Sequence, residues 1–427
     1  MRIVRPRDQN YARFLKSLDR RAAALPATEK TVRGIIAAIE KDGDAALIRF
    51  TKKFGGPKLT PVQLRVPARE VSSAWKSLDA PTRRALQAAH KNIRAFARRS
   101  LRKNWSTRNA QGARVGERFD PFQRVGIYVP GGTAPLVSTA LMTCTFAAAV
   151  GVPEIVAVTP AGPDGKISRE LLAALHLAGA TEVYRVGGAQ AVAVLACGTK
   201  TIRPVAKVFG PGNSYVVEAK RQLFGRVAVD LLPGPSEILV IADRTANPAW
   251  VAADLLAQAE HGRDSVALLL TDSQDVLKAV AREIDKQAAT LPRGAILKNS
   301  LRGSSLVLVR NMDEAVATAN AFASEHVSLQ VRNPGALAPK LLTSGAIFLG
   351  GWSPVAVGDF LAGPSHELPT GGAGKSFAGL TADQFQRRTS LVELDRRSLA
   401  KSVAAVEAFA RVEGLDAHGR SARIRLA

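Results

Sequence analysis

The 427-residue chain has only two cysteines and few aromatic residues. Cys144 and Cys197 are too few for a disulfide framework, and both stand in apolar segments typical of small buried residues. No apolar run reaches the ~18 residues that a bilayer-spanning helix needs. The basic residues at positions 1–7 are not followed by the apolar segment of a signal peptide. These absences argue against a disulfide-stapled secreted protein and against a membrane protein, so we expect a cytoplasmic location.

Acidic residues are also scarce, with 36 against 59 lysines and arginines, which gives a net charge of +23. Between Arg83 and Arg118 the only acidic residue is Glu117. Apolar residues recur there at helical spacing, at Leu86, Ala89, Ile93 and Phe96. The pattern predicts an amphipathic helix with a basic outer face. Such a face can bind nucleic acid or simply be solvated. Because no stacking set of aromatics, zinc finger or helix-turn-helix pattern accompanies it, we favour the solvated face.

Short apolar strands alternate with helices from position 124 onward, whereas residues 29–53 and 67–103 are predicted to be helical. The strands are predicted at 125–129, 155–158, 182–186, 205–209, 238–242, 266–270, 305–309, 327–331 and 346–349. This alternation is typical of an α/β fold with parallel, doubly wound sheets, and the material suits two Rossmann-like lobes. Ligands of such sheets bind beyond the carboxyl ends of the strands.

The predicted domain organisation follows from this pattern. We expect an N-terminal helical arm at 1–25 and a C-terminal helical tail at 381–427. One Rossmann-like lobe is expected to combine 26–127 with 237–380, and the second to comprise 128–236.

Glycine-rich turns follow several predicted strands, as in Gly187-Gly188 and Gly210-Pro211-Gly212. Glycine lets the backbone approach a phosphate or nicotinamide closely, and a helix N-terminus favours an anion. Each turn alone is weak evidence, because glycine after a strand is common. A complete G-x-G-x-x-G fingerprint is absent, so a dinucleotide would have to bind in a non-standard way.

A candidate metal site begins with Gln258 and His261, which are three residues apart and share one helix face. Asp359 and His418 could complete a set of two nitrogens and two oxygens, which suits zinc. The spacing between these residues is long. From the residues alone, each histidine is equally compatible with a surface position or a hydrogen-bonded place in the core.

A candidate acid–base pair, Glu325-His326, follows a predicted helix at 313–323 and precedes a strand. Histidine titrates near neutral pH, and burial can raise the pKa of a glutamate until it serves as a base. The alternative is a structural histidine facing the helix dipole.

Taken together, the motifs resemble those of the histidinol dehydrogenase family along nearly the whole chain. The matching segments are 125–136 (VGIYVPGGTAPL), 186–191 (VGGAQA), 209–215 (FGPGNSY), 233–237 (PGPSE), 258–262 (QAEHG), 358–359 (GD), 366–370 (HELPT) and 414–418 (GLDAH). The resemblance implies oxidation of L-histidinol to L-histidine through the aldehyde, in the last steps of histidine biosynthesis. It implies two NAD+ per turnover and one Zn2+ per subunit.

The resemblance also assigns roles to individual residues. It implies the zinc ligands Gln258, His261, Asp359 and His418. It implies the catalytic bases Glu325 and His326, and the NAD contacts Tyr128, Gln190 and Asn213. The implied substrate contacts are Ser236, His366 and Glu413, together with His326 and the zinc ligands. Finally, it implies a homodimer in which the tail, 381–427, crosses to the active site of the partner.

Some residues depart from the family pattern. Ser324 precedes the Glu-His pair where the family usually has proline, and the residues around His366 are Gly-Pro-Ser-His-Glu rather than the more familiar Thr-Asn-His-Val. An enzyme with the same fold and cofactors that acts on another amino alcohol or a sulfonated diol therefore stays open as an alternative. Glu413 and His418 favour histidinol, because they fall where the family binds its substrate.

Overall fold

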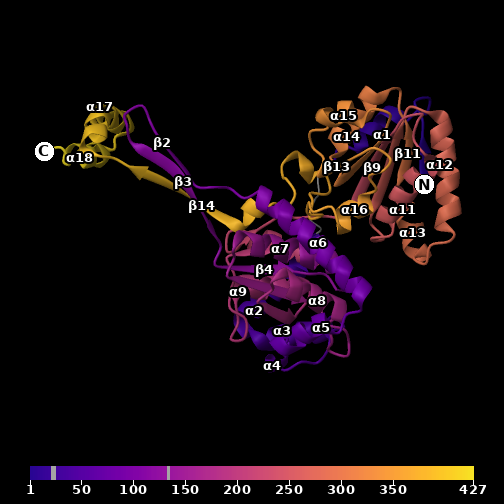
Figure 1. Cartoon of the computed structure of the whole chain (residues 1–427), viewed down its shortest axis with the longest axis horizontal. Coiled ribbons are helices and arrows are strands. Elements are labelled where there is room, and N and C mark those ends of the chain that lie inside the picture. The colour runs from indigo at the N-terminus through magenta and orange to yellow at the C-terminus, as the bar shows by residue number, and fades with distance from the viewer. Residues whose placement is uncertain (21–25, 132–134) are drawn as a thin grey trace.

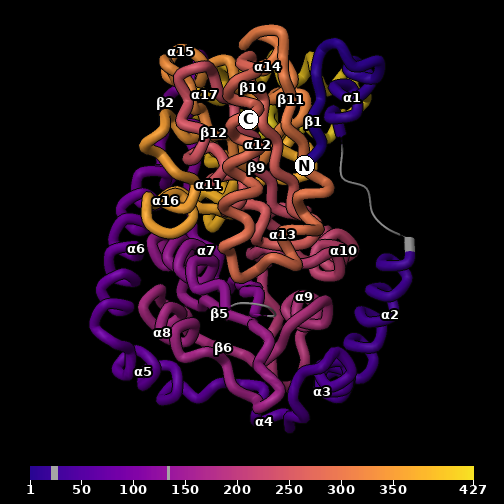
Figure 2. The backbone as a smooth tube through the Cα atoms, turned by 90° about the vertical axis from the view of Figure 1, so that its right-hand side faces the viewer, coloured from indigo at the N-terminus to yellow at the C-terminus, as the bar shows by residue number. Residues whose placement is uncertain are grey.

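Two α/β lobes and a projecting arm make up the computed structural model, which describes residues 1–20, 26–131 and 135–427 (Figure 1). Figure 2 shows the larger lobe, with α12 (Gln274–Ala288) and α14 (Met312–Phe322), stacked above the smaller one, with α5 (Ala68–Lys76) and α8 (Arg169–Ala178). No helix in these described ranges is long and apolar enough to cross a membrane.

The large lobe contains a six-stranded parallel sheet in the order β1-β11-β10-β9-β12-β13. Its strands are β1 (Arg2–Val4), β9 (Glu237–Ala242), β10 (Val266–Thr271), β11 (Ser305–Leu308), β12 (His326–Gln330) and β13 (Ala346–Leu349). In β9 the side chains alternate: Ile238 and Val240 pack with α11 (Pro248–Ala259), while Leu239 and Ile241 pack with α14. A strand with two buried faces has to be apolar throughout, as β9 is after its first residue. The remaining helices of this lobe are α1 (Tyr11–Ser17), α13 (Gly294–Ser300), α15 (Pro334–Leu337) and α16 (Val355–Phe360).

The small lobe contains a five-stranded parallel sheet in the order β6-β5-β4-β7-β8. Its strands are β4 (Arg124–Tyr128), β5 (Glu154–Thr159), β6 (Glu182–Arg185), β7 (Lys207–Phe209) and β8 (Ala228–Val229). One face is covered by α5, α6 (Ala80–Arg99), α7 (Val137–Val150) and α8. The other is covered by α2 (Pro26–Asp42), α3 (Asp44–Lys53), α9 (Gly188–Cys197) and α10 (Ser214–Leu223), with α4 (Pro61–Leu64) at the edge.

Both sheets are wound in the same way. In the small sheet β4 lies in the middle, with β5 and β6 on one side and β7 and β8 on the other. In the large sheet β9 takes the middle place, with β10 and β11 on one side and β12 and β13 on the other. This doubly wound order confirms the predicted fold class. The nine predicted strands all form, with ends that differ by at most two residues.

The assignment of segments to lobes differs from the predicted boundaries. Residues 2–17, expected to be a helical arm, supply β1 and α1 to the large lobe, where β1 pairs with β11. Helices α2 to α6, expected with the large lobe, pack on the small sheet, and β4 is the central strand of that sheet. The amphipathic pattern of these helices shows that one face is buried, but it does not reveal which sheet buries it.

Helix α6 has the predicted amphipathic character. Leu86, Ala89, Ile93 and Ala97 are buried, whereas Phe96 is 40% exposed.

An antiparallel three-stranded sheet, in the order β14-β3-β2, forms the stem of the arm. Its strands are β2 (Trp105–Arg108), β3 (Arg114–Pro121) and β14 (Gln386–Glu393). Two helices, α17 (Arg396–Glu413) and α18 (Asp416–Arg423), lie at the far end, well away from both lobes (Figure 1). The predicted helical tail thus contains a strand as well, and the three strands of the arm had no counterpart in the sequence prediction.

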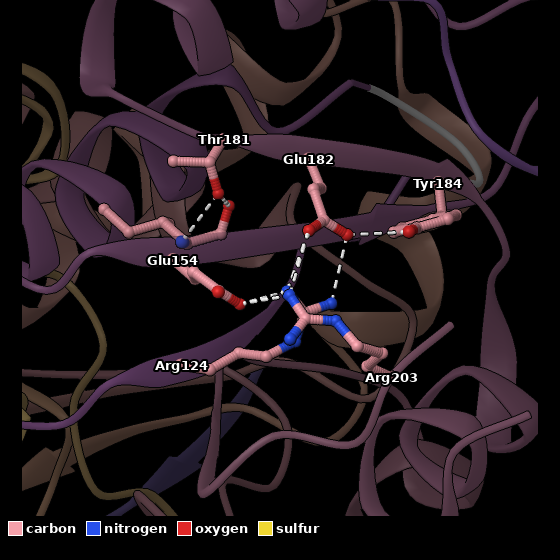
Figure 3. Close-up of polar contacts among 7 residues, drawn as sticks. Arg124, Glu154, Thr181, Glu182, Tyr184 and Arg203 are labelled. Atoms are coloured by element: carbon pink, nitrogen blue, oxygen red, sulfur yellow. Dashed lines mark hydrogen bonds and ion pairs between the residues drawn. The ribbon is translucent and has the colours of Figure 1, made fainter. Parts of the chain in front are cut away.

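The amino ends of β4, β5 and β6 are joined by a polar network (Figure 3). Arg124 donates to Glu154 at 2.6 Å and to both carboxylate oxygens of Glu182 at 2.8 and 3.0 Å. Tyr184 donates to Glu182, and Arg203 donates to Glu154, each at 2.7 Å. The hydrogen bond from Arg124 lowers the pKa of Glu182 to about 2. This network lies at the opposite edge of the sheet from the glycine-rich turns.

Candidate active site between the two lobes

The glycine-rich turns of the small lobe meet at the carboxyl ends of β4, β6 and β7, as the sequence predicted. Tyr128 ends β4, and its hydroxyl accepts a hydrogen bond from the Gly188 amide at 3.3 Å. Gln190 is buried in the first turn of α9, and its amide oxygen has no partner among the described residues. Asn213 caps α10 by accepting from the Tyr215 and Val216 amides. The three predicted NAD contacts therefore lie at the same carboxyl edge of the sheet, although 132–134 of the turn after β4 lie outside the described residues.

Gly210 brings the end of β7 against the end of β4. Its φ is +108°, and a Cβ at this position would lie 2.0 Å from the Tyr128 carbonyl oxygen, so only glycine fits. Lys220 donates to the Gly210 carbonyl and, at 2.6 Å, to Asp230. Asp230 in turn accepts from the Gly210 amide at 2.7 Å. This ion pair, whose side chains are each 1% exposed, was not predicted from the sequence, and it holds the turn that leads to Asn213.

Glu325 and His326 are both buried at the amino end of β12. The Glu325 carboxylate accepts from the Glu237 amide at 2.8 Å, and Nδ1 of His326 lies 3.2 Å from the Glu237 carbonyl oxygen. Burial raises the pKa of Glu325 to about 7. Burial would lower the pKa of His326, but the nearby carboxylates of Glu325 and Asp359 outweigh it and raise that pKa. Near neutral pH, this pair can hold and release a proton.

The pair lies at the start of β12, as the sequence predicted, and so at the amino ends of β9 and β12 rather than at the carboxyl ends where ligands of such sheets usually bind. The contact between the two lobes brings these edges together. Thr139, in the first turn of the helix that follows β4, is 3.0 Å from Nε2 of His366. His366 belongs to the segment after α16, beside Asp359. The carboxyl edge of the small sheet is thus linked to the side chains at the amino edge of the large sheet.

Asp359 and His366 form the centre of this link. Asp359 in α16 places Oδ1 3.4 Å from Nε2 of His326, and its carbonyl oxygen is 2.9 Å from Nδ1 of His366. Burial would raise the pKa of Asp359, but His326 outweighs it and lowers that pKa. Burial would lower the pKa of His366, but Glu367 and Asp359 raise it to about 9.

Gln258 lies in the last turn of α11, whereas His261 lies just beyond its C-cap, Glu260, and is not on the helix face that the sequence predicted. Gln258 is buried, and its amide nitrogen has no partner among the described residues. Burial lowers the pKa of His261, while the charge of Asp359 acts to raise it, so these two side chains are within electrostatic reach. The side-chain amide, the imidazole and the Asp359 carboxylate are a donor set that suits zinc. Within the described ranges, however, no three His, Cys, Asp or Glu residues are grouped as a metal site.

The other predicted site residues are divided between the body and the arm. Ser236 immediately precedes Glu237, whose backbone contacts both Glu325 and His326, so Ser236 lies close to that pair in the chain. Glu413 ends α17 and His418 lies in α18, both exposed at the tip of the arm (Figure 1). His418 lines a surface depression of about 560 Å³ there. One chain by itself therefore does not bring Glu413 and His418 to the other site residues.

Comparisons with known proteins agree on one family. A family model described as histidinol dehydrogenase matches residues 18–426. The chain is 42% identical to the histidinol dehydrogenase of Syntrophotalea carbinolica over 428 residues, covering 100% of this chain and 99% of that protein. It is 43% identical to that of Bradyrhizobium diazoefficiens, covering 98% and 96%. The crystal structure of the histidinol dehydrogenase from Elizabethkingia anophelis superposes with a TM-score of 0.94 at 33% identity, covering 100% of this chain and 98% of that one.

Proposed function

The chain belongs to the histidinol dehydrogenase family, and from this premise we propose that it oxidises L-histidinol to L-histidine through L-histidinaldehyde, with two NAD+ per turnover and one Zn2+ per subunit. The observation that carries the proposal is the buried Glu325-His326 pair, held by the backbone amide and carbonyl of Glu237 and in contact with Asp359. The first oxidation releases one proton from the hydroxyl group, and the second releases two, one from the added water and one when the carboxylic acid ionises. The pair offers one group for the hydroxyl proton and one for the proton of the water, and the last proton leaves to solvent.

The two groups divide the proton transfers. With Nδ1 of His326 donating to the Glu237 carbonyl, Nε2, which lies 3.4 Å from Oδ1 of Asp359, is the nitrogen that takes the hydroxyl proton of histidinol as the hydride leaves its carbon. Glu325, with a pKa raised to about 7, takes a proton from the water that adds to the aldehyde. A second hydride then leaves the hydrated aldehyde, which gives the carboxylate. When bound, NAD+ accepts the two hydrides, and zinc supplies a cation that holds the substrate.

The cofactor contacts are those that the family resemblance implies. Tyr128, Gln190 and Asn213 face NAD+ at the carboxyl edge of the small sheet, and the unpartnered amide oxygen of Gln190 is available to a ligand. Gln258, through its amide oxygen, His261 and Asp359 would supply three zinc ligands from one chain. His418 supplies the fourth from the partner.

A homodimer with crossed arms completes the site. The arm exposes several large apolar side chains, namely Val392 (69%), Phe409 (68%), Val412 (85%) and Ile424 (60%). An exposed apolar surface of this kind marks an interface. A crossed arrangement would bring Glu413 and His418 to the site of the other subunit.

The reaction is tested by product stoichiometry. We expect two NADH per L-histidine formed from L-histidinol, without accumulation of aldehyde. A chelator should abolish activity, and added Zn2+ should restore it. Release of the aldehyde at one NADH per substrate would refute the two-step reaction, and full activity after verified removal of metal would refute the zinc requirement.

The crossed arms are tested by mixing two inactive proteins, His418→Ala and His261→Ala, under conditions that exchange subunits. In a hybrid dimer one site would carry both lesions and the other neither, so up to about a quarter of wild-type activity should return at statistical exchange. Native mass spectrometry of differently tagged subunits verifies the hybrid. Verified hybrids without activity would show that each arm serves its own subunit.

A further inference from the structure

Glu237, the first residue of β9, contacts both members of the catalytic pair through its backbone. Its amide donates to Glu325 at 2.8 Å, and its carbonyl oxygen is 3.2 Å from Nδ1 of His326. Since β9 pairs with β12 in parallel, these contacts place Glu325 and His326 at the edge of the sheet. The orientation of one residue therefore determines the position of two reacting groups.

The side chain of Glu237 is an unusual choice for this strand. The five residues that follow it in β9 are all apolar and buried, whereas Glu237 buries a carboxylate that is 1% exposed. One oxygen, Oε1, pairs with Arg20 and also accepts from the Gly371 amide at 3.1 Å. The other, Oε2, has no partner among the described residues. Burying such a pair costs several kcal/mol in desolvation per ion, so a well-packed apolar pair would stabilise the sheet at least as well.

Arg20 is itself held in place from two sides. Its guanidinium lies over the ring of Phe322, 4.0 Å from the centroid. The carbonyl oxygen of Arg20 lies against Gly372. A Cβ added at Gly372 would come within 2.2 Å of this oxygen, and the φ of Gly372 is +83°. Arg20 is therefore anchored between α14 and the turn at 371–372, and its guanidinium group reaches Glu237 at the start of β9.

We propose that Glu237 is a positioning residue, locked by Arg20, whose backbone orients the Glu325 carboxylate and selects the Nδ1-protonated form of His326. This inference rests on the proposed function of the pair. A hydrogen bond from Nδ1 to a backbone carbonyl leaves Nε2 as the basic nitrogen, which is the form that proton abstraction needs. Loss of the Arg20–Glu237 contact leaves an unpaired buried charge, and the start of β9 then moves to relieve it.

A positioning role makes a distinctive kinetic prediction. Because one backbone serves both groups, Glu237→Gln and Arg20→Met should slow the histidinol and the histidinaldehyde oxidations by a similar factor, about ten- to a hundredfold. The KM for NAD+ should stay within about twofold, since the hydrogen bonds of Glu237 among the described residues are to Arg20, Glu325, His326 and Gly371, all in the large lobe. Combining the two substitutions removes both charges, so the double variant should be faster than Arg20→Met alone.

A matched pair of control variants comes from the network at the far edge of the small sheet (Figure 3). Arg124→Met and Glu182→Gln break a buried Arg–Glu contact of the same type, at 2.8 Å, away from the candidate site. They should lower the melting temperature but keep kcat per folded subunit within about twofold. A purely structural role for Glu237 would give its variants this same result, with a lower melting temperature and unchanged kcat, and would overturn the inference.

A second measurement does not depend on turnover. In protein labelled with 15N-histidine, His326→Asn identifies the His326 signals among those of the six histidines. Wild type should show His326 protonated at Nδ1, and Arg20→Met should shift the signals toward a mixture of tautomers. Identical His326 signals in both proteins would overturn the inference. If wild type failed to oxidise histidinol, the proposed function would fall, and the NMR result would still decide whether Arg20 and Glu237 set the tautomer.

Discussion

Asp254 offers a direct test of how burial acts on charge in the large lobe. It lies on α11, is 7% exposed, and accepts two long hydrogen bonds, from Ser328 and Gln330, each at 3.3 Å. Burial raises its pKa from 3.8 to about 6, and these hydrogen bonds only partly oppose the shift. Asp254→Asn keeps an oxygen for both donors and removes the charge.

The expected gain follows from proton linkage. Below about pH 4 the carboxyl group is protonated in both the folded and the unfolded chain, so its contribution to stability is fully present. As pH rises from about 4 to about 6, the Asp254 carboxyl group ionises first in the unfolded chain, so the folded state loses stability. Above pH 6 this loss is complete. A shift of roughly two units corresponds to about 3 kcal/mol at 1.36 kcal/mol per unit. Relative to wild type, the Asn variant should therefore gain up to about 3 kcal/mol between pH 4 and pH 7.

Thermal unfolding of the two proteins across this pH range gives the measurement. For a lobe of this size, about 3 kcal/mol corresponds to an increase in melting temperature of roughly 6–12 °C at pH 7. Glu283→Gln on α12 is the control, because its carboxylate is at the surface and its pKa is lowered by the hydrogen bond from Gln287. It should give no gain at neutral pH. If the difference between Asp254→Asn and wild type is the same at pH 4 and pH 7, Asp254 is already ionised in the folded state and the reasoning fails.

Three further predictions concern the candidate site. Lys220→Met leaves the Asp230 carboxylate buried without its cation, so it should lower the free energy of unfolding by about 3–5 kcal/mol and raise the KM for NAD+. Adding Asp230→Asn should recover part of this stability in urea unfolding, and equal stability of the single and double variants would contradict the prediction. Gly210→Ala should weaken NAD+ binding in a fluorescence titration far more than Gly225→Ala, because both have positive φ but only at Gly210 would a Cβ meet backbone. Glu325→Gln should spare aldehyde formation and slow aldehyde oxidation about a hundredfold in rapid-quench assays, and equal slowing of both steps would assign Glu325 a positioning role.

The sheets could be predicted from the sequence because strands buried on both faces have to be continuously apolar, as Leu239 to Ala242 are. The strands of the arm could not. Strand β2 is exposed at all four residues and β14 is largely exposed, so neither carries the alternation that marks a half-buried strand. Their pairing depends on β3, which joins segments far apart in the chain.

The site could be predicted in part, for a similar reason. The spacing of Gln258 and His261 brings both to the carboxyl end of one helix, although His261 lies just past its C-cap, and the order of the glycine-rich turns brings Tyr128 and Gln190 to one sheet edge. The pattern also places Glu325 and His326 at the start of their strand. It does not encode how the two lobes meet, which brings the carboxyl edge of the small sheet to this pair. The contact between Arg20 and Glu237 joins residues 217 positions apart, and only a charge in an otherwise apolar strand hinted at it.

The arm also has a consequence for how the chain folds while it is being translated. Strand β3 ends at Pro121 and its partner β14 begins at Gln386, so about 260 residues are translated before the central strand of the arm is paired on both edges. At roughly 5–20 residues per second, the β2–β3 hairpin waits on the order of ten seconds or more at the ribosome with one edge open. The first strand of the chain, β1, waits longer still for β11. An open strand edge is a template for pairing with other chains, so the nascent protein is most exposed to aggregation before its last forty residues emerge.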